Sequence, residues 1–290
     1  MIRALALGAC AFSLATAPAL AQTKPRPAAP APAAQPARPA AGDWRTPDPQ
    51  NVLVIDTNKG RVLVEMVPQL APQHVERIRT LTRQGLYDGR KFFRVIDAFM
   101  AQTGDPQDTG EGGSALPDLP AEFTFRVAPP EMVKVHADAV SEIGFIGPVP
   151  IRSQNAWMAA ATVDGKVTAF GLYCPGVGGM ARGGDPGSAN SQFFLMRAKY
   201  PSLEQRYTVW GRVISGLDVV RAIKTGEPVA PPQDEMQKVR VLADIPAAER
   251  PKVRVVDTKS PWLAAEVERL KALKGPDFSA CDIELPVEVK

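Results

Sequence analysis

Several residue types that common functional sites need are scarce in this chain of 290 residues. The two histidines, His74 and His136, lie far apart and have no cysteine or carboxylate at metal-ligand spacing, which excludes a histidine-rich zinc site. The same scarcity leaves no usable histidine–nucleophile–carboxylate set and argues against a hydrolase. The formal net charge is only +3, which gives no broad basic field, so we expect no binding to nucleic acid.

The first 21 residues have the pattern of a signal peptide. A short positive start precedes an apolar stretch from Ala4 to Leu20, and Ala19-Leu20-Ala21 is a small-x-small cleavage site. We therefore expect cleavage after Ala21, a periplasmic or secreted protein, and no integral membrane span after the signal is removed. The alternative is a lipoprotein box, Leu7-Gly8-Ala9-Cys10, but it would leave an apolar region of four residues, far short of the usual ~7–15.

Residues 22–49 are rich in proline and alanine and show no apolar periodicity. Because proline blocks helix formation, this composition predicts an extended, semi-rigid linker. A ligand for a proline-recognising groove is the alternative interpretation.

The remaining sequence is dominated by β-branched stretches separated by turn residues. It predicts strands at Asn51–Asp56, Arg61–Met66, Lys91–Ile96, Gln192–Arg197, Tyr207–Ile214, Lys238–Ala243, Lys252–Asp257 and Ile283–Val289. Helical periodicity follows Pro72 as far as Gly85, with Val75, Ile78, Leu81 and Thr82 on one face. It recurs at Leu217–Lys224, and it follows Pro261 as far as Gly275. Because helices and strands do not alternate, we expect a mainly β fold, a closed antiparallel barrel of about eight strands capped by two helices.

Two segments carry the candidate chemistry. Residues 92–105 read F-F-R-V-I-D-A-F-M-A-Q-T-G-D, and residues 180–196 read M-A-R-G-G-D-P-G-S-A-N-S-Q-F-F-L-M. In the first, Arg94 stands among apolar neighbours on a predicted strand, where a guanidinium is rarely buried unless it is paired or lies in a cleft. For this segment alone, a strand-edge arginine that faces solvent is the simpler interpretation.

Taken together, the two segments resemble the cyclophilins, a family of peptidyl-prolyl cis-trans isomerases with the hallmark segments F-H-R-V-I-x-x-F-M-x-Q-G-G-D and M-A-N…N-G-S-Q-F-F. The resemblance runs from about Val52 to Ala243 and contains both segments in the family's order. It implies a cyclophilin-like domain at residues 50–245 with an insertion at about 127–175. Residues 246–290 then form a strand–helix–strand extension that packs on the domain.

The resemblance also implies a role for each matching residue. Arg94 matches the family's catalytic arginine, and Gln102 matches the glutamine that hydrogen-bonds the substrate backbone. The residues that match the apolar proline pocket are Phe99, Met100, Phe194 and Leu203. The other positions that match substrate contacts are Ala181, Arg182, Gln192 and Tyr207.

The implied reaction needs no nucleophile, acid or base, so we expect no cofactor and no metal. Amide resonance holds an X–Pro bond planar behind a barrier of roughly 18–20 kcal/mol. A guanidinium near the prolyl nitrogen donates to its lone pair as resonance is lost, which stabilises the twisted amide. We therefore expect isomerisation of X–Pro bonds in exported proteins, with proline-containing unfolded or extended polypeptides as partners. The alternative function is a proline-peptide binding or holdase module with weak or no catalysis.

The sequence departs from the family pattern at several positions. Arg182 stands in place of asparagine, and Tyr207 in place of a pocket-lining histidine. Ser202 stands where many eukaryotic members, which cyclosporin inhibits, have tryptophan. We expect these changes to affect substrate preference more than activity.

The insertion and a glycine-rich loop lie outside the two segments. Asn155–Thr162 and Lys166–Tyr173, with an Asp164-Gly165 turn between them, predict an added hairpin. It serves either as a packing elaboration or as a rim that selects substrates. The loop 109–114 lacks the Gly-Lys-Ser/Thr ending of a phosphate-binding loop, and in cyclophilins a comparable loop borders the cleft.

The cysteines predict a disulfide. Of the three, Cys10 lies in the signal peptide, so Cys174 and Cys281 remain in the mature chain. An oxidising compartment favours a bridge between them, and two buried free thiols are the alternative.

Overall fold

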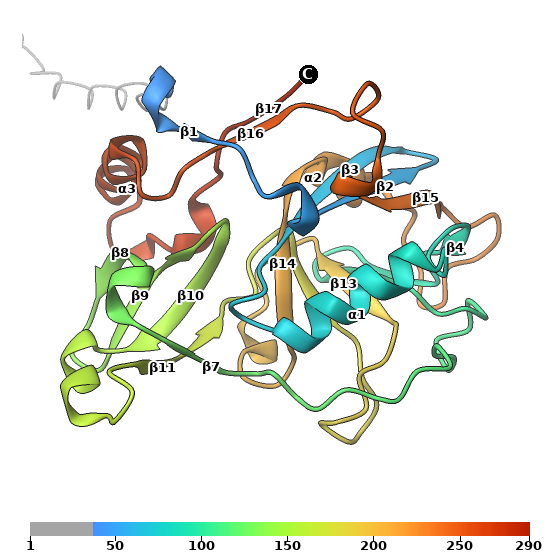
Figure 1. Cartoon of the computed structure of the whole chain (residues 1–290), viewed down its shortest axis with the longest axis horizontal. Helices are drawn as coiled ribbons and strands as arrows, with labels where there is room; N and C mark the ends of the chain where they lie inside the picture. The colour runs from blue at the N-terminus through green and yellow to red at the C-terminus, as the bar shows by residue number, and fades with distance from the viewer. Residues whose placement is uncertain (1–36) are drawn as a thin grey trace, which may run out of the picture. The chain divides into compact units, whose positions relative to one another are not determined.

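A curled antiparallel sheet of nine strands is the centre of the computed structural model, which describes residues 37–290 (Figure 1). The strands follow the order β4-β15-β2-β3-β14-β12-β13-β6-β5. They are β2 (Val52–Thr57), β3 (Gly60–Met66), β4 (Arg90–Lys91), β5 (Arg94–Ile96), β6 (Met100–Thr103), β12 (Val177–Met180), β13 (Phe193–Met196), β14 (Val209–Ser215) and β15 (Glu235–Val241). The predicted signal peptide and the first part of the predicted linker, residues 1–36, lie outside the described residues.

The sheet is not a closed barrel, which corrects the expectation from the sequence. Within the described residues its end strands, β4 and β5, do not pair with each other, although only Phe92 and Phe93 separate them. The Phe92 amide donates to the Asp234 carbonyl at 2.9 Å, and the Phe93 carbonyl accepts from the Val229 amide at 2.9 Å. The two residues between β4 and β5 are thus bonded to the segment 229–234, which directly precedes β15. The strand predicted at Lys91–Ile96 is therefore two short strands, β4 and β5.

The helix α1 (Pro72–Arg83) packs against this sheet. It begins with proline and ends before Gly85, whose φ is +72°, as the sequence predicts. Its apolar face consists of Val75, Ile78 and Leu81, which are at most 1% exposed and share one core with β2, β3 and β15. Burial of each such side chain stabilises the fold by about 1.5–3 kcal/mol.

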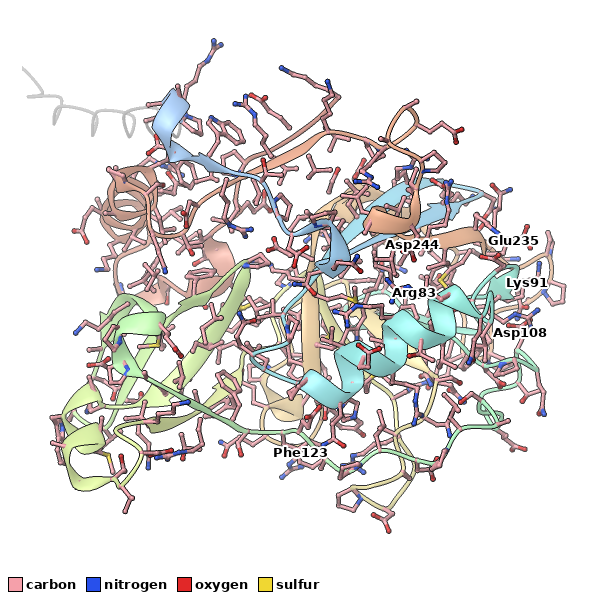
Figure 2. The ribbon with its side chains drawn as sticks, in the orientation of Figure 1. Arg83, Lys91, Asp108, Phe123, Glu235 and Asp244 are labelled. Atoms are coloured by element: carbon pink, nitrogen blue, oxygen red, sulfur yellow. A yellow bond between two sulfur atoms is a disulfide. The ribbon has the colours of Figure 1, made fainter. Side chains whose placement is uncertain are left out.

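Ion pairs attach α1 and β4 to the region of β15. Figure 2 shows Arg83 at the end of α1, where its Nε lies 2.9 Å from Oδ2 of Asp244. Lys91 of β4 pairs with Glu235 of β15. A second, shorter helix, α2 (Leu217–Ala222), follows β14.

The insertion forms a second sheet of five strands in the order β7-β11-β10-β9-β8. They are β7 (Phe125–Val127), β8 (Val133–Ala137), β9 (Ser141–Ile146), β10 (Val149–Gln154) and β11 (Val167–Gly171). The predicted hairpin is wrong in its first half, Asn155–Thr162, because Ala156–Ala161 is a 3-10 helix and β11 pairs with β10 instead. This alanine-rich stretch lacks the β-branched side chains that favour strands.

The C-terminal residues contribute to a third sheet, in the order β1-β16-β17. They form β16 (Val253–Val256), α3 (Pro261–Lys274) and β17 (Val287–Val289), the strand–helix–strand order that the sequence predicts. The third strand, β1 (Trp44–Arg45), comes from residues that the sequence assigns to the linker. The Arg45 guanidinium binds the Glu65 carboxylate of β3 at 2.7 and 2.9 Å, which fixes β1 on the main sheet.

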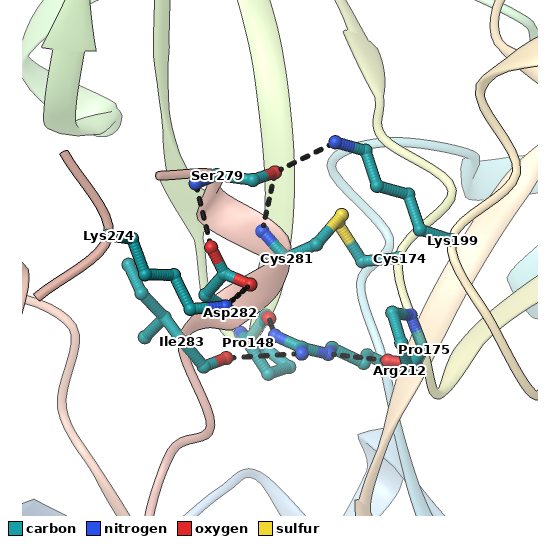
Figure 3. Close-up of a disulfide and its surroundings, with 10 residues drawn as sticks. All are labelled: Pro148, Cys174, Pro175, Lys199, Arg212, Lys274, Ser279, Cys281, Asp282 and Ile283. Carbon is teal, nitrogen blue, oxygen red and sulfur yellow. Dashed lines mark hydrogen bonds and ion pairs between the residues drawn. A yellow bond between two sulfur atoms is a disulfide. The ribbon is translucent and has the colours of Figure 1, made fainter. Parts of the chain in front are cut away.

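A disulfide between Cys174 and Cys281 joins the C-terminal residues to the segment before β12, as Figure 3 shows. It confirms the pairing predicted from the cysteine count. Beside it, the buried Arg212 of β14 donates to three backbone carbonyl groups, and burial lowers its pKa to about 10. The acceptors are the carbonyl oxygens of Pro148, Pro175 and Ile283, at 3.2, 3.3 and 3.2 Å. These bonds link the main sheet, the insertion and the C-terminal extension.

Candidate active site

Three neighbouring strands bring the polar and apolar site residues to one face. In the register of β5, β6 and β13, Gln102 lies opposite Arg94 on one side and opposite Phe194 on the other. Directly opposed residues of antiparallel strands project to the same face of the sheet. Met100 joins them because it stands two residues before Gln102 on β6.

A chain of hydrogen bonds fixes the polar side chains. Arg94 Nη1 donates to Gln102 Oε1 at 3.3 Å, and Gln102 Nε2 donates to Gln192 Oε1 at 2.9 Å. Gln192 Nε2 then donates to the carbonyl oxygens of Gly110 and Gly112, at 2.9 and 2.8 Å. The side-chain amides of Gln102 and Gln192 are therefore both oriented, because the oxygen and the nitrogen of each one have a hydrogen-bond partner.

The glycine-rich loop that receives this chain is anchored by Asp105, which the assignment of site residues from the sequence did not include. Its carboxylate is fully buried and accepts hydrogen bonds from the backbone amides of Gln107, Thr109, Gly110 and Gly112 and from the Thr109 hydroxyl. Burial raises the pKa of Asp105, but these hydrogen bonds outweigh it and hold the pKa below its usual value. The sequence did contain a signal for this role, namely an aspartate at the start of a glycine-rich loop, because aspartate side chains accept hydrogen bonds from the backbone amides of the residues that follow them.

The expected proline-pocket residues meet beside this network. Phe194 is 4% exposed and Leu203 is 8% exposed, and both belong to one apolar cluster with Met100. Phe99, Ala181 and Tyr207 pack against that cluster and are half-buried. The Tyr207 ring meets Phe194 edge to face, with centroids 6.1 Å apart and planes at 78°. All the apolar residues assigned from the sequence therefore lie together.

Arg182 lies between Tyr207, at the edge of this apolar cluster, and a cleft of about 420 Å³. Its guanidinium carbon is 4.5 Å from the Tyr207 ring centroid and 5.6 Å from that of Phe123, the residue labelled in Figure 2. Its Nε donates to the Arg206 carbonyl at 3.0 Å. The cleft itself is lined by Gln102, Ala181, Arg182, Gln192 and the loop 110–113. Arg182 therefore places a positive charge beside the cleft.

Residues 52–243 match the family model described as "Cyclophilin type peptidyl-prolyl cis-trans isomerase/CLD". This chain belongs to the cyclophilin family. It is a cyclophilin-type peptidyl-prolyl cis-trans isomerase, as the resemblance of the two segments predicted.

Relatives of this cyclophilin occur in bacteria and in eukaryotes. A probable peptidyl-prolyl cis-trans isomerase of Brucella suis is 37% identical over 190 residues, which are 62% of this chain and 74% of the relative. Peptidyl-prolyl cis-trans isomerase ppi1 of Schizosaccharomyces pombe is 29% identical over 185 residues, 61% of this chain and 91% of that protein. The crystal structure of cyclophilin AquaCyp293 from Hirschia baltica gives a TM-score of 0.78 at 34% identity and covers 85% of this chain and 93% of its own. That structural match extends beyond residues 52–243.

Tyr173 is a second residue beside the candidate site that the sequence assignment missed. Its ring stacks on Phe194, with centroids 6.0 Å apart and planes at 26°, and burial raises its pKa well above the usual value. Gly179 makes room for this pair, since a Cβ there would lie 2.5 Å from Phe194 Cζ and 2.9 Å from the Tyr173 hydroxyl. Tyr173 stands at the end of the insertion, where no family segment marks it.

Glu227 is the third residue at the candidate site that the sequence assignment missed. Its Oε1 lies 2.5 Å from Nε of Arg94, and the two side chains are 55% and 36% exposed. The partners are 133 positions apart in the chain, so sequence spacing gave no signal for this pair.

No group of three or more His, Cys, Asp or Glu side chains in residues 37–290 is arranged to hold a metal ion. No helix in the same range is both long enough and apolar enough to cross a membrane.

Proposed function

We propose that this isomerase acts on X–Pro bonds of exported proteins and so assists their folding, with Arg94 as the residue that lowers the barrier. The observation that carries the assignment of Arg94 is its place on one face with Gln102 and with Phe194, which belongs to the apolar cluster. A guanidinium there donates to the prolyl nitrogen as the amide twists and its lone pair becomes available.

The apolar cluster binds the proline ring in this proposal. Phe99, Met100, Phe194 and Leu203 supply contact area and exclude water from the amide. Excluding water lowers the local dielectric, which strengthens the interaction of Arg94 with the twisted amide.

Gln102 holds the substrate backbone. Its Oε1 accepts from Arg94, and one hydrogen of Nε2 is used by Gln192. The amide nitrogen carries a second hydrogen, which is the donor available to a substrate carbonyl. The backbone of Ala181 and Arg182 holds the residue before proline, and Tyr207 completes the pocket.

Export is proposed from the N-terminal pattern of residues 1–21. The disulfide Cys174–Cys281 supports it, because disulfides persist in oxidising compartments such as the periplasm. Fractionation of cells that express the full chain, with N-terminal sequencing of the product, tests this part. A periplasmic product that begins at Gln22 is expected, and an uncleaved cytoplasmic product would contradict it.

A protease-coupled assay on an X–Pro peptide tests the catalytic assignment. Arg94→Ala is expected to lower kcat/KM by about tenfold or more, with an unchanged circular dichroism spectrum. Unchanged turnover of a folded Arg94→Ala protein would remove Arg94 from the mechanism. A wild-type protein that binds the peptide without turnover would favour a proline-peptide binding or holdase module.

A further inference from the structure

We infer that Glu227 is a positioning residue that orients the Arg94 guanidinium for isomerisation, an inference that rests on the proposed role of Arg94. Glu227 binds Nε of Arg94 at 2.5 Å, and Gln102 binds Nη1 at 3.3 Å. A guanidinium is planar and presents its N–H groups in a rigid fork, so two bonded positions define its plane.

These two bonds leave one end of the fork available. Within residues 37–290 no hydrogen bond is formed by Nη2 of Arg94. Glu227 and Gln102 therefore hold the side chain by Nε and Nη1 and leave Nη2 for the prolyl nitrogen. Without Glu227, rotation about the last side-chain bonds of Arg94 would be limited by Gln102 alone.

The backbone places Glu227 where this contact is made. Val95 and Gly226 form an antiparallel bridge, with N···O distances of 2.8 Å in both directions. Glu227 follows Gly226 and Arg94 precedes Val95, so the bridge sets the two side chains directly opposite each other. A Cβ on Gly226 would lie 2.6 Å from Val229 Cα, so glycine is required where the chain after Glu227 folds back past residue 226.

Because Glu227 and Arg94 are both partly exposed, a change at Glu227 can be tested for its effect on activity without a large effect on stability. An ion pair between side chains that are 36% and 55% exposed adds little to the free energy of folding. Removing Glu227 should therefore leave the fold intact and change only the orientation of Arg94. The chain offers a matched control in Glu288 and Arg254, which are 38% and 45% exposed and form a 2.5 Å pair in the C-terminal sheet.

The test compares kcat and KM of the full chain for Glu227→Ala, Glu227→Gln and Glu288→Ala in the protease-coupled assay. Glu227→Ala is expected to lower kcat by about tenfold with little change in KM, because orientation matters most in the transition state. Glu227→Gln keeps a neutral acceptor and should recover part of that loss. Glu288→Ala should match the wild type.

A double variant completes the cycle. If Glu227 acts through Arg94, adding Glu227→Ala to Arg94→Ala causes no further loss of kcat. Wild-type kcat in Glu227→Ala, beside a clear loss in Arg94→Ala, would overturn the inference and leave the proposed function standing. An increase in kcat, or an equal loss in both backgrounds, would also overturn it. If Arg94→Ala itself has wild-type turnover, the proposed function fails and the role of Glu227 fails with it.

Discussion

Tyr173 and Phe194 stack with their ring centroids 6.0 Å apart, and this contact joins the insertion to the apolar cluster that we propose as the proline pocket. Tyr173 directly precedes Cys174, which is bonded to Cys281 in the C-terminal extension. Phe194 is therefore packed against the insertion, and the disulfide ties that part of the insertion to the C-terminal extension. Both of these segments lie outside the two hallmark segments. Packing in protein interiors is close enough that a displaced Tyr173 would be felt by Phe194.

The first prediction concerns Gly179, which lies against this pair. In Gly179→Ala the new methyl group would lie 2.5 Å from Phe194 Cζ, so the ring must move. Overpacking of this kind costs about 1–3 kcal/mol, and we expect a matching loss in the free energy of unfolding by urea, with a lower kcat/KM. Gly184→Ala is the control, because a Cβ at Gly184 would have no neighbour within 4 Å. Equal activity and stability of the two variants would show that the pocket tolerates the displacement.

The second prediction concerns the disulfide. Cys174 and Cys281 are 107 positions apart, and in the chain-entropy model a bridge across such a loop stabilises by about 4–5 kcal/mol at most. The double variant Cys174→Ser, Cys281→Ser should unfold at a lower urea concentration than the wild type. Its free energy of unfolding should be lower by up to about 4–5 kcal/mol. Peptide mass analysis after alkylation of the denatured, unreduced chain should find neither cysteine modified. Modification of both before reduction would exclude the bridge.

The third prediction concerns pH and Asp105. The pKa of this carboxyl is lower in the folded protein than its ordinary value of 3.8, so its contribution to stability is full above that value and is lost as pH falls through the folded pKa. At pH 7, Asp105→Asn should reduce the free energy of unfolding by about 1–3 kcal/mol, because a charged acceptor is removed. The difference between wild type and variant should narrow below about pH 4. A difference that stays constant down to pH 3 would contradict this role.

The fourth prediction concerns cyclosporin. Ser202 is exposed beside the pocket residue Leu203, where a tryptophan would offer a large apolar face to the inhibitor. Burial of an aromatic of that size is worth a few kcal/mol, so we expect inhibition weaker by about two orders of magnitude than in members with tryptophan. Ser202→Trp should raise sensitivity while kcat/KM for a proline peptide stays near the wild-type value. Nanomolar inhibition of the unchanged protein would show that Ser202 does not control binding.

The sequence by itself determined part of the local structure and supplied most of the residues that make up the candidate site. Pro72 and Gly85 bounded α1, and the spacing of Val75, Ile78 and Leu81 identified its buried face. The β-branched runs predicted the strands β2, β3 and β13 to β17, but not β1, β6, β12 or the insertion strands β7 to β10. The two hallmark segments identified the family. These features are encoded by neighbouring residues, through backbone preference and side-chain periodicity, so they are visible without any long-range contact.

Only the tertiary structure decided which distant segments meet. It left the end strands β4 and β5 unpaired with each other and bonded Phe92 and Phe93 to the segment 229–234. It placed Glu227 opposite Arg94 across 133 positions. It also packed Tyr173 behind Phe194 and paired Trp44 with Val256 of β16. Each of these contacts depends on how several elements pack at once, and no local pattern specifies such a contact, because many distant segments offer similar apolar faces and unpaired backbone groups.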